Sequence, residues 1–158
     1  MIIISQDGKK MMVYIHYGHK YFDKKLFEKV RNDYFTKPIG GFWGSRVGAE
    51  YGWKEWINAK NFKLNKYRED NYFKFKLKDD ARVLVIDNIK ILDKLPKNKS
   101  NILNSSWCSL DFEELSKKYD AIEVLITNSN GLYWKFYGWD CDSILIMNED
   151  IIEEIKEV

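Results

Sequence analysis

Cysteine and proline are scarce in this chain of 158 residues, which contains two of each. Cys108 and Cys141 form neither a CxxC motif nor a zinc-ligand spacing, so we expect two buried free thiols in a reducing compartment. A disulfide or a nucleophilic Cys141 is the less favoured alternative. No apolar run reaches the roughly 18 residues of a membrane-spanning helix, and the first residues lack the features of a secretory signal. We therefore expect a cytoplasmic protein with no membrane partner and no metal.

An excess of charge of one sign is missing too, because the formal net charge is only +2. Electrostatics thus neither require nor exclude a polyanionic partner. Aromatic residues, in contrast, make up 16% of the chain, and they can fill a core, line a ligand pocket or stack on bases. The length and the 45% hydrophobic content predict one globular domain over residues 1–158.

The N-terminal third predicts a hairpin and two helices. Two apolar runs around an Asp-Gly dipeptide predict a hairpin over 1–18. Asp23 can cap a helix over 24–34, whose apolar residues recur at helical spacing. Pro38 and a glycine pair then interrupt the chain, and a second helix is predicted over 47–59.

The remaining two thirds predict an alternation of strands and short helices. The sequence "YFKFKLK", residues 72–78, places phenylalanine and lysine on opposite faces of a strand. The other expected elements are a strand over 81–87, a short helix from Asn88 to Pro96, a loop over 98–106, a helix from Asp111 to Tyr119, strands over 121–127, 132–137 and 143–147, and a final helix around 151–155. Helices gathered in the first two thirds and antiparallel-type strands at both ends indicate an α+β domain.

Three short motifs fall at the ends of predicted strands. His16 ends a strand in "YIHYG", Trp43 lies in "GGFWGS", and Asp142 opens the apolar run of "DCDSILI". Taken singly, each has an ordinary explanation as a structural histidine, a core tryptophan or a turn aspartate. Together they are more informative, because strand ends of one packed sheet can converge on a cleft.

In this order the motifs resemble the ADP-ribosyltransferase superfamily, particularly the branch with a His/aromatic/acidic triad and a poly(ADP-ribose) polymerase-like catalytic fold. The resemblance extends over about 14–147. It implies a single α+β domain with antiparallel-rich, split β-sheets and flanking short helices. It also implies NAD as the substrate and transfer of ADP-ribose to an acceptor, which the sequence leaves open among protein, nucleic acid and small molecule.

The resemblance further implies roles for individual residues. His16 would bind a ribose hydroxyl, Trp43 would be the triad aromatic, and Asp142 would be the catalytic acid. A carboxylate suits this role because breaking the nicotinamide–ribose bond generates oxocarbenium character. Asp140 would only shape the turn. The residues implied to bind the cofactor are His16, Tyr17, Gly18, Trp43, Ser45, Tyr51 and Trp53.

Departures from the family pattern keep one alternative open, and a separate segment of the sequence offers another. A tyrosine separates the histidine from the glycine, Trp43 stands where tyrosine is usual, and Asp142 is shorter than the usual glutamate. The first alternative is therefore a catalytically inactive binding or inhibitor protein on the same fold. The second is a nucleic-acid-binding module that uses the lysine- and aromatic-rich segment 60–78, although base stacking would need both residue types on one exposed face.

Overall fold

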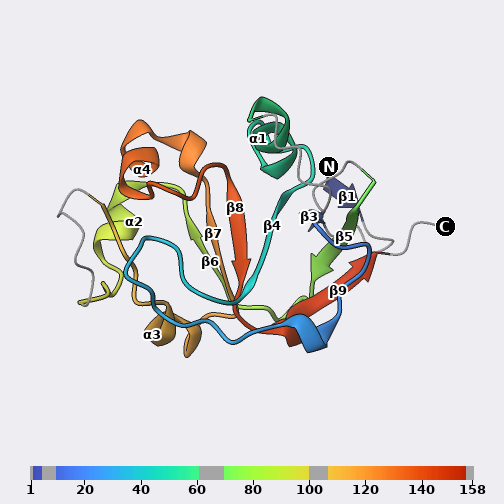
Figure 1. Cartoon of the computed structure of the whole chain (residues 1–158), viewed down its shortest axis with the longest axis horizontal. Helices are drawn as coiled ribbons and strands as arrows, with labels where there is room; N and C mark the ends of the chain where they lie inside the picture. Colours follow the sequence, from blue (N-terminus) through green and yellow to red (C-terminus); the bar gives the residue numbers. More distant parts are fainter. Residues whose placement is uncertain (1, 5–9, 61–69, 100–106, 156–158) are drawn as a thin grey trace.

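The computed structural model describes residues 2–4, 10–60, 70–99 and 107–155 (Figure 1). The strands are β1 (Ile2–Ile4), β2 (Lys10–Met12), β3 (Tyr14–Tyr17), β4 (Phe42–Arg46), β5 (Tyr72–Leu77), β6 (Val83–Ile86), β7 (Ala121–Val124), β8 (Ser143–Ile146) and β9 (Ile152–Ile155). The helices are α1 (Trp53–Ala59), α2 (Ile89–Asp93), α3 (Phe112–Ser116) and α4 (Asn130–Lys135), with 3₁₀ turns η1 (Lys24–Leu26), η3 (Ile126–Asn128) and η4 (Glu149–Ile151).

Seven strands form one sheet in the order β6-β7-β8-β4-β3-β5-β9, and β1 pairs with β2 separately. Within the large sheet β6 and β7 are parallel, and the other neighbouring strands are antiparallel. The described residues thus form a small α+β domain with a mostly antiparallel sheet and few helices, which confirms the predicted α+β class.

Two hydrophobic cores lie on the two faces of this sheet. Leu145 of β8 packs into the first core, beside the fully buried Trp139. Its neighbours Ile144 and Ile146 point the other way, into a second core that contains Phe75. Because successive side chains of a strand alternate between faces, a strand between two cores needs apolar residues on both faces, and Ile144, Leu145 and Ile146 of β8 supply them.

The sheet opens between β3 and β4. These strands are paired only at Tyr14 with Arg46 and at Ile15 with Ser45. Beyond that point β3 continues along β5, whereas β4 continues along β8 (Figure 1). The ends of β3 and β4 therefore diverge, and the space between them is where a ligand site can form.

Three predicted helices and strands are wrong in type. The segment 24–34 contains only η1, because Arg31 forms a backbone bridge with Ile39 and the chain turns back at two glycines of positive φ. Residues 132–137 fall largely in α4 rather than in a strand. The C-terminal residues form β9 instead of a helix, because their backbone groups pair with the edge of β5 and Glu153 meets Lys76 across the strands at 2.8 Å.

Several other predictions are confirmed, some with shifted bounds. The strands at 72–78, 81–87, 121–127 and 143–147 correspond to β5, β6, β7 and β8. Asn88 and Asp111 cap α2 and α3 through their side chains. The predicted hairpin is present as β1 and β2, but β3 is a separate strand, and the Asp-Gly turn and most of loop 98–106 lie outside the described residues. The second helix starts at Trp53, after a turn at Gly48 with φ of +78°.

Candidate functional site

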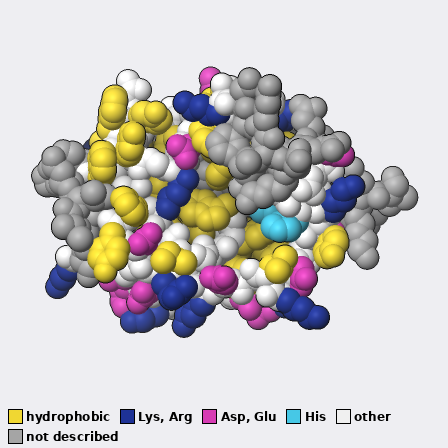
Figure 2. Space-filling model, viewed as in Figure 1, with side chains coloured by type: hydrophobic (Ala, Val, Ile, Leu, Met, Phe, Trp, Pro, Cys, Tyr) yellow, Lys and Arg dark blue, Asp and Glu magenta, His cyan; other side chains and the backbone are white. Residues whose placement is uncertain are grey.

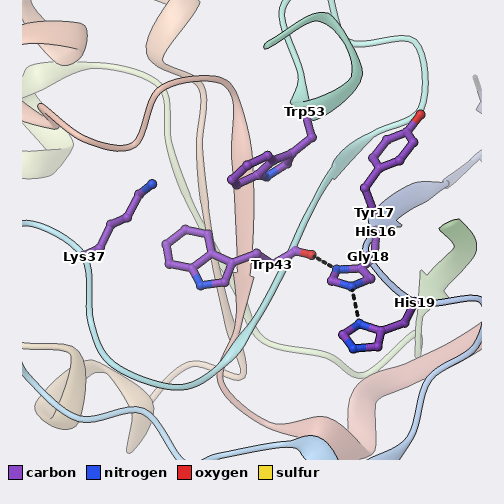
Figure 3. A pocket seen from close by; sticks show the side chains of 7 residues that line it. All are labelled: His16, Tyr17, Gly18, His19, Lys37, Trp43 and Trp53. Carbon is purple, nitrogen blue, oxygen red and sulfur yellow. Dashed lines mark hydrogen bonds between the residues drawn. The ribbon is translucent and has the colours of Figure 1, made fainter. Parts of the chain in front are cut away.

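A cavity of about 200 Å³ lies where β3 and β4 diverge. It is lined by His16, Tyr17, Gly18, His19, Lys37, Trp43 and Trp53 (Figure 3). Five of these residues were predicted to bind the cofactor, so the structure brings most of that set together. In the space-filling view, histidine borders a hollow floored by hydrophobic side chains (Figure 2).

The sheet order accounts for this convergence. The three motifs lie on or next to β3, β4 and β8, and these strands are neighbours in the order β8-β4-β3. His16 is in β3 and Trp43 in β4, while Asp142 directly precedes β8. Motifs that are more than 25 residues apart in sequence are thus placed at one end of three adjacent strands.

Hydrogen bonds at both ring nitrogens fix the orientation of His16. Its Nδ1 lies 2.7 Å from the carbonyl oxygen of Trp43, and because a carbonyl only accepts, Nδ1 carries the hydrogen. Its Nε2 lies 3.0 Å from Nδ1 of His19, and the two imidazoles stack with centroids 5.2 Å apart. A neutral His16 therefore accepts at Nε2 from His19. Phe42, with its ring centroid 4.2 Å from that of His16, supports the imidazole from the second core.

Gly18 serves the site through its conformation rather than its amide hydrogen. Its φ of +121° lies in a region that favours glycine, and it turns the chain from β3 toward His19. Its N–H donates to the carbonyl of Asn71 at 2.8 Å. This N–H is therefore already used within the protein, in contrast to the ligand contact that the family resemblance implies.

Two indoles and one ammonium group form the rest of the wall. The Nζ of Lys37 lies 5.7 Å from the ring centroid of Trp43 and 5.8 Å from that of Trp53, within the range of cation–π attraction. Trp43 in turn packs edge-on against the buried Trp139, with centroids 4.9 Å apart. Figure 3 shows Lys37 on one side of the two indoles and the histidine pair on the other.

Asp140 and Asp142 have different surroundings from those expected. The Asp142 carboxylate accepts hydrogen bonds from the backbone N–H and the hydroxyl of Thr127, at 3.0 and 2.7 Å, and Asp142 is only 8% exposed. It is not among the described residues that line the cavity. Asp140 has a left-handed φ of +63° and forms an ion pair with Lys37 at 3.0 Å. Asp140 is therefore the carboxylate linked to the cavity wall.

Ser45 and Tyr51 act behind the cavity, not in its described lining. The hydroxyl oxygen of Ser45 accepts a hydrogen bond from the backbone N–H of Trp53 at 3.1 Å, which anchors the start of α1. The carbonyl of Tyr51 accepts from the N–H of Asp142 at 3.0 Å. Both contacts hold the backbone at or just before the start of α1 next to β4 and the segment that precedes β8.

His19 and Lys37 are lining residues that the sequence analysis missed. The signal for His19 was the second histidine of "HYGH", three residues after the first. Lys37 gave no comparable signal, because it lies in the irregular segment before β4 and reaches the cavity only through the tertiary fold. One wall donor also lacks an acceptor: the Nε1 of Trp53 is buried, and no described side chain or backbone group accepts its hydrogen.

The two cysteines are buried free thiols, as predicted. Burial raises the pKa of Cys141 to about 12 and also raises the pKa of Cys108. Neither thiol is therefore ionised near neutral pH. A nucleophilic role for Cys141 gains no support from this environment.

No protein-family profile, curated protein or solved structure matches the chain in the comparisons. Within the described residues, no three or more His, Cys, Asp or Glu side chains are grouped so that they could hold a metal ion. None of the helices in the described part of the chain is long and apolar enough to cross a membrane.

Proposed function

We propose that the protein binds NAD in the cavity between β3 and β4 and cleaves its nicotinamide–ribose bond, as an ADP-ribosyltransferase-like protein. The observation that carries this proposal is the convergence of His16, Gly18, Trp43 and Trp53 on one cavity. These residues come from three separate segments, and all were selected by their likeness to the transferase motifs.

The chemistry of the wall suits the nicotinamide half of NAD. The nicotinamide ring is planar and positively charged, and indole faces attract such rings. The ammonium group of Lys37 lies across the indoles from the histidines and is paired with Asp140, so it closes the wall on the side away from the ribose site (Figure 3). His16 is held by Trp43, so that a ribose hydroxyl can replace His19 at its Nε2.

One observation favours a second candidate, a protein that binds NAD without cleaving it. Asp142, which the resemblance makes the catalytic acid, has its carboxylate bonded to Thr127. To stabilise a ribosyl cation it would have to leave those two hydrogen bonds. Asp140, held by Lys37, is the other carboxylate near the site.

Calorimetric titration with NAD and an assay for released nicotinamide test both candidates. We expect saturable binding that His16→Ala and Trp53→Ala each weaken by about tenfold or more, the scale of losing a buried ring contact. Trp134→Ala, which removes a 64% exposed indole on α4, is the matched control and should change nothing. Nicotinamide release would establish cleavage of NAD, by transfer or by hydrolysis, and binding without release would establish the second candidate. Absence of saturable binding would reject both.

A further inference from the structure

A second hollow lies on the outer face of β3 and β5. It measures about 410 Å³, and its lining includes Tyr17, Arg46, Lys54, Glu55, Tyr72 and Lys74. By strand alternation, Tyr72 and Lys74 point away from the core that holds Phe73 and Phe75. We call this hollow the outer groove. It shares Tyr17 with the cavity described above.

The charge in the outer groove is positive. Arg46 binds Glu123 through two hydrogen bonds of 2.7 and 2.6 Å, and Glu123 is almost fully buried beneath it. This pair is therefore internally neutralised. The carboxylate of Glu55 is directed to the N–H of Gly52 at 3.0 Å. Glu55 keeps its negative charge, and Lys54 and Lys74 lie on α1 and β5, on two sides of the groove. Three positive groups (Arg46, Lys54 and Lys74) against two negative ones (Glu55 and Glu123) leave these residues with an excess of one positive charge.

Aromatic rings lie on the same face as these lysines. The rings of Tyr17 and Tyr72 are in contact, with centroids 5.8 Å apart and planes tilted by 51°. The Nζ of Lys74 lies 5.9 Å from the ring centroid of Tyr72. The phenylalanines of β5 are buried, as predicted, but Tyr72 supplies an aromatic ring on the lysine face. The condition for base stacking next to phosphate binding is thus met here.

We propose that the outer groove binds single-stranded nucleic acid. A base would stack on Tyr72 and Tyr17, and flanking phosphates would approach Lys54 and Lys74. A single strand fits better than a duplex, because only unpaired bases offer their faces to side chains. A hollow of this size accommodates about one nucleotide, within the usual range for small-ligand sites.

The groove also suggests the acceptor for the reaction proposed above, and this part of the inference rests on that proposal. Tyr17 lines both sites, so a strand in the groove lies beside the nicotinamide ribose. A nitrogen or oxygen of the strand would form a bond to C1′ while the bond from C1′ to nicotinamide breaks. The electron pair of that bond leaves with neutral nicotinamide, and the proton of the attacking group goes to solvent.

Binding is tested without NAD, by fluorescence anisotropy of a labelled oligothymidylate of about twelve nucleotides. We expect binding that weakens with salt. In the double variant Lys54→Gln/Lys74→Gln, the slope of log affinity against log salt should fall by about 1.4, since each phosphate contact of a single strand contributes about 0.7. Tyr72→Leu should weaken binding about tenfold and leave the salt slope unchanged, because it removes stacking alone.

Matched controls keep this test specific. Lys90→Gln/Lys118→Gln removes the same charge from exposed positions on and beside α2 and α3. Tyr133→Leu removes a 47% exposed tyrosine from α4. Both should bind the oligonucleotide as the parent does. We call Lys54→Gln/Lys74→Gln the groove pair and Lys90→Gln/Lys118→Gln the control pair. Absence of binding by the parent, or an equal loss of affinity in the two pairs, would overturn the proposal.

The acceptor role is tested with NAD that carries biotin on its adenine. A biotin-labelled oligonucleotide whose yield falls in the groove pair, and not in the control pair, would support it. Nicotinamide release with an unlabelled strand would reject the acceptor role and leave the binding result to stand by itself. Calorimetry should show that the groove pair binds NAD as the parent does, so failure of the groove and failure of the NAD cavity are distinguishable.

Discussion

At the scale of single residues, the side chains of the cavity wall fix one another's positions through hydrogen bonds, an ion pair and cation–π contacts. His16 is fixed between the Trp43 carbonyl and His19, and Lys37 is fixed between two indoles and Asp140. These contacts preorganise the wall, but they also occupy donors and acceptors that a ligand needs. A ligand must therefore replace some of these internal contacts with its own. Substitution of single wall residues separates the contacts that help binding from those that compete with it.

The first prediction concerns His19. Because its ring occupies the Nε2 of His16, His19→Ala should raise the affinity for NAD, by about two- to tenfold if one ordinary hydrogen bond is released. Calorimetric titration measures this change, and His16→Ala should have the opposite effect. A fall in affinity as large as that of His16→Ala would instead show that His19 itself contacts the ligand.

The second prediction concerns Cys141. Burial raises its pKa to about 12, so the reactive thiolate is almost absent at pH 8. The folded protein should therefore react slowly with a disulfide reagent such as Ellman's reagent, and both thiols should react at once after unfolding in urea. Absorbance of the released thiolate follows the reaction. Rapid modification of Cys141 in the folded protein, identified by mass spectrometry, would contradict the buried environment.

At the scale of elements, local signals predicted what local interactions determine. The alternation in β5 and the continuous apolar run in β8 gave the right strands, and the side-chain caps gave α2 and α3. The prediction of a helix in the C-terminal segment was wrong because this segment pairs with β5, which lies far away in sequence and leaves no local signal. The apolar spacing of 24–34 was misleading, since that segment forms a backbone bridge next to β4.

In the candidate site, too, the sequence predicted what short motifs encode and missed what depends on contacts between distant residues. The motifs identified His16, Trp43 and Trp53 because their order resembles that of a known family. The direction of Asp142 could not be predicted, since it depends on Thr127 and on the left-handed φ of Asp140, neither of which a strand pattern encodes.

The third prediction concerns the junction of β6, β7 and β8. Asp120 directly precedes β7 and accepts hydrogen bonds from Arg82 and from Asn148 beyond β8. These contacts, above all those with Arg82, hold the pKa of Asp120 well below its usual range. Asp120→Asn should lower the free energy of unfolding at pH 7 by about 1–3 kcal/mol, since the buried carboxylate that pairs with the charged Arg82 becomes a neutral amide.

The pH dependence of this effect has a definite sign. A lowered folded-state pKa means that the stabilisation is fully present above the unfolded pKa of about 3.9 and is lost as the pH falls through the folded value. Urea unfolding at pH 7 and near pH 2 should therefore show a difference between parent and variant that shrinks in acid. Asp150→Asn, which breaks an exposed pair with Lys24, is the control and should have little effect at either pH. A constant difference between parent and Asp120→Asn across this range would contradict the assignment.

At the scale of the whole molecule, a single sheet separates two cores and opens between β3 and β4. The cavity lies at this opening, and the outer groove lies on the neighbouring face of β3 and β5. Tyr17 is common to both. The position of β3 relative to β4 therefore sets the geometry of both sites, and at Gly44 the two strands approach each other closely. A Cβ atom at Gly44 would lie 3.0 Å from the Ile15 carbonyl oxygen and 3.1 Å from the ring of Phe75.

The last prediction is that Gly44→Ala weakens NAD binding without touching the ligand. The added methyl group must push β3 or Phe75 by a few tenths of an ångström, and overpacking of this kind costs about 1–3 kcal/mol of stability. Because β3 carries His16 and β4 carries Trp43, the same displacement should strain the hydrogen bond that joins them. Leu132→Ala is the control, since it empties space in the first core, under α4, and should cost about 2–5 kcal/mol without moving β3. Thermal unfolding and calorimetric titration on both variants separate the effects. If Leu132→Ala lowered NAD affinity as much as Gly44→Ala does, affinity would follow overall stability, and the spacing of β3 and β4 would not be the cause.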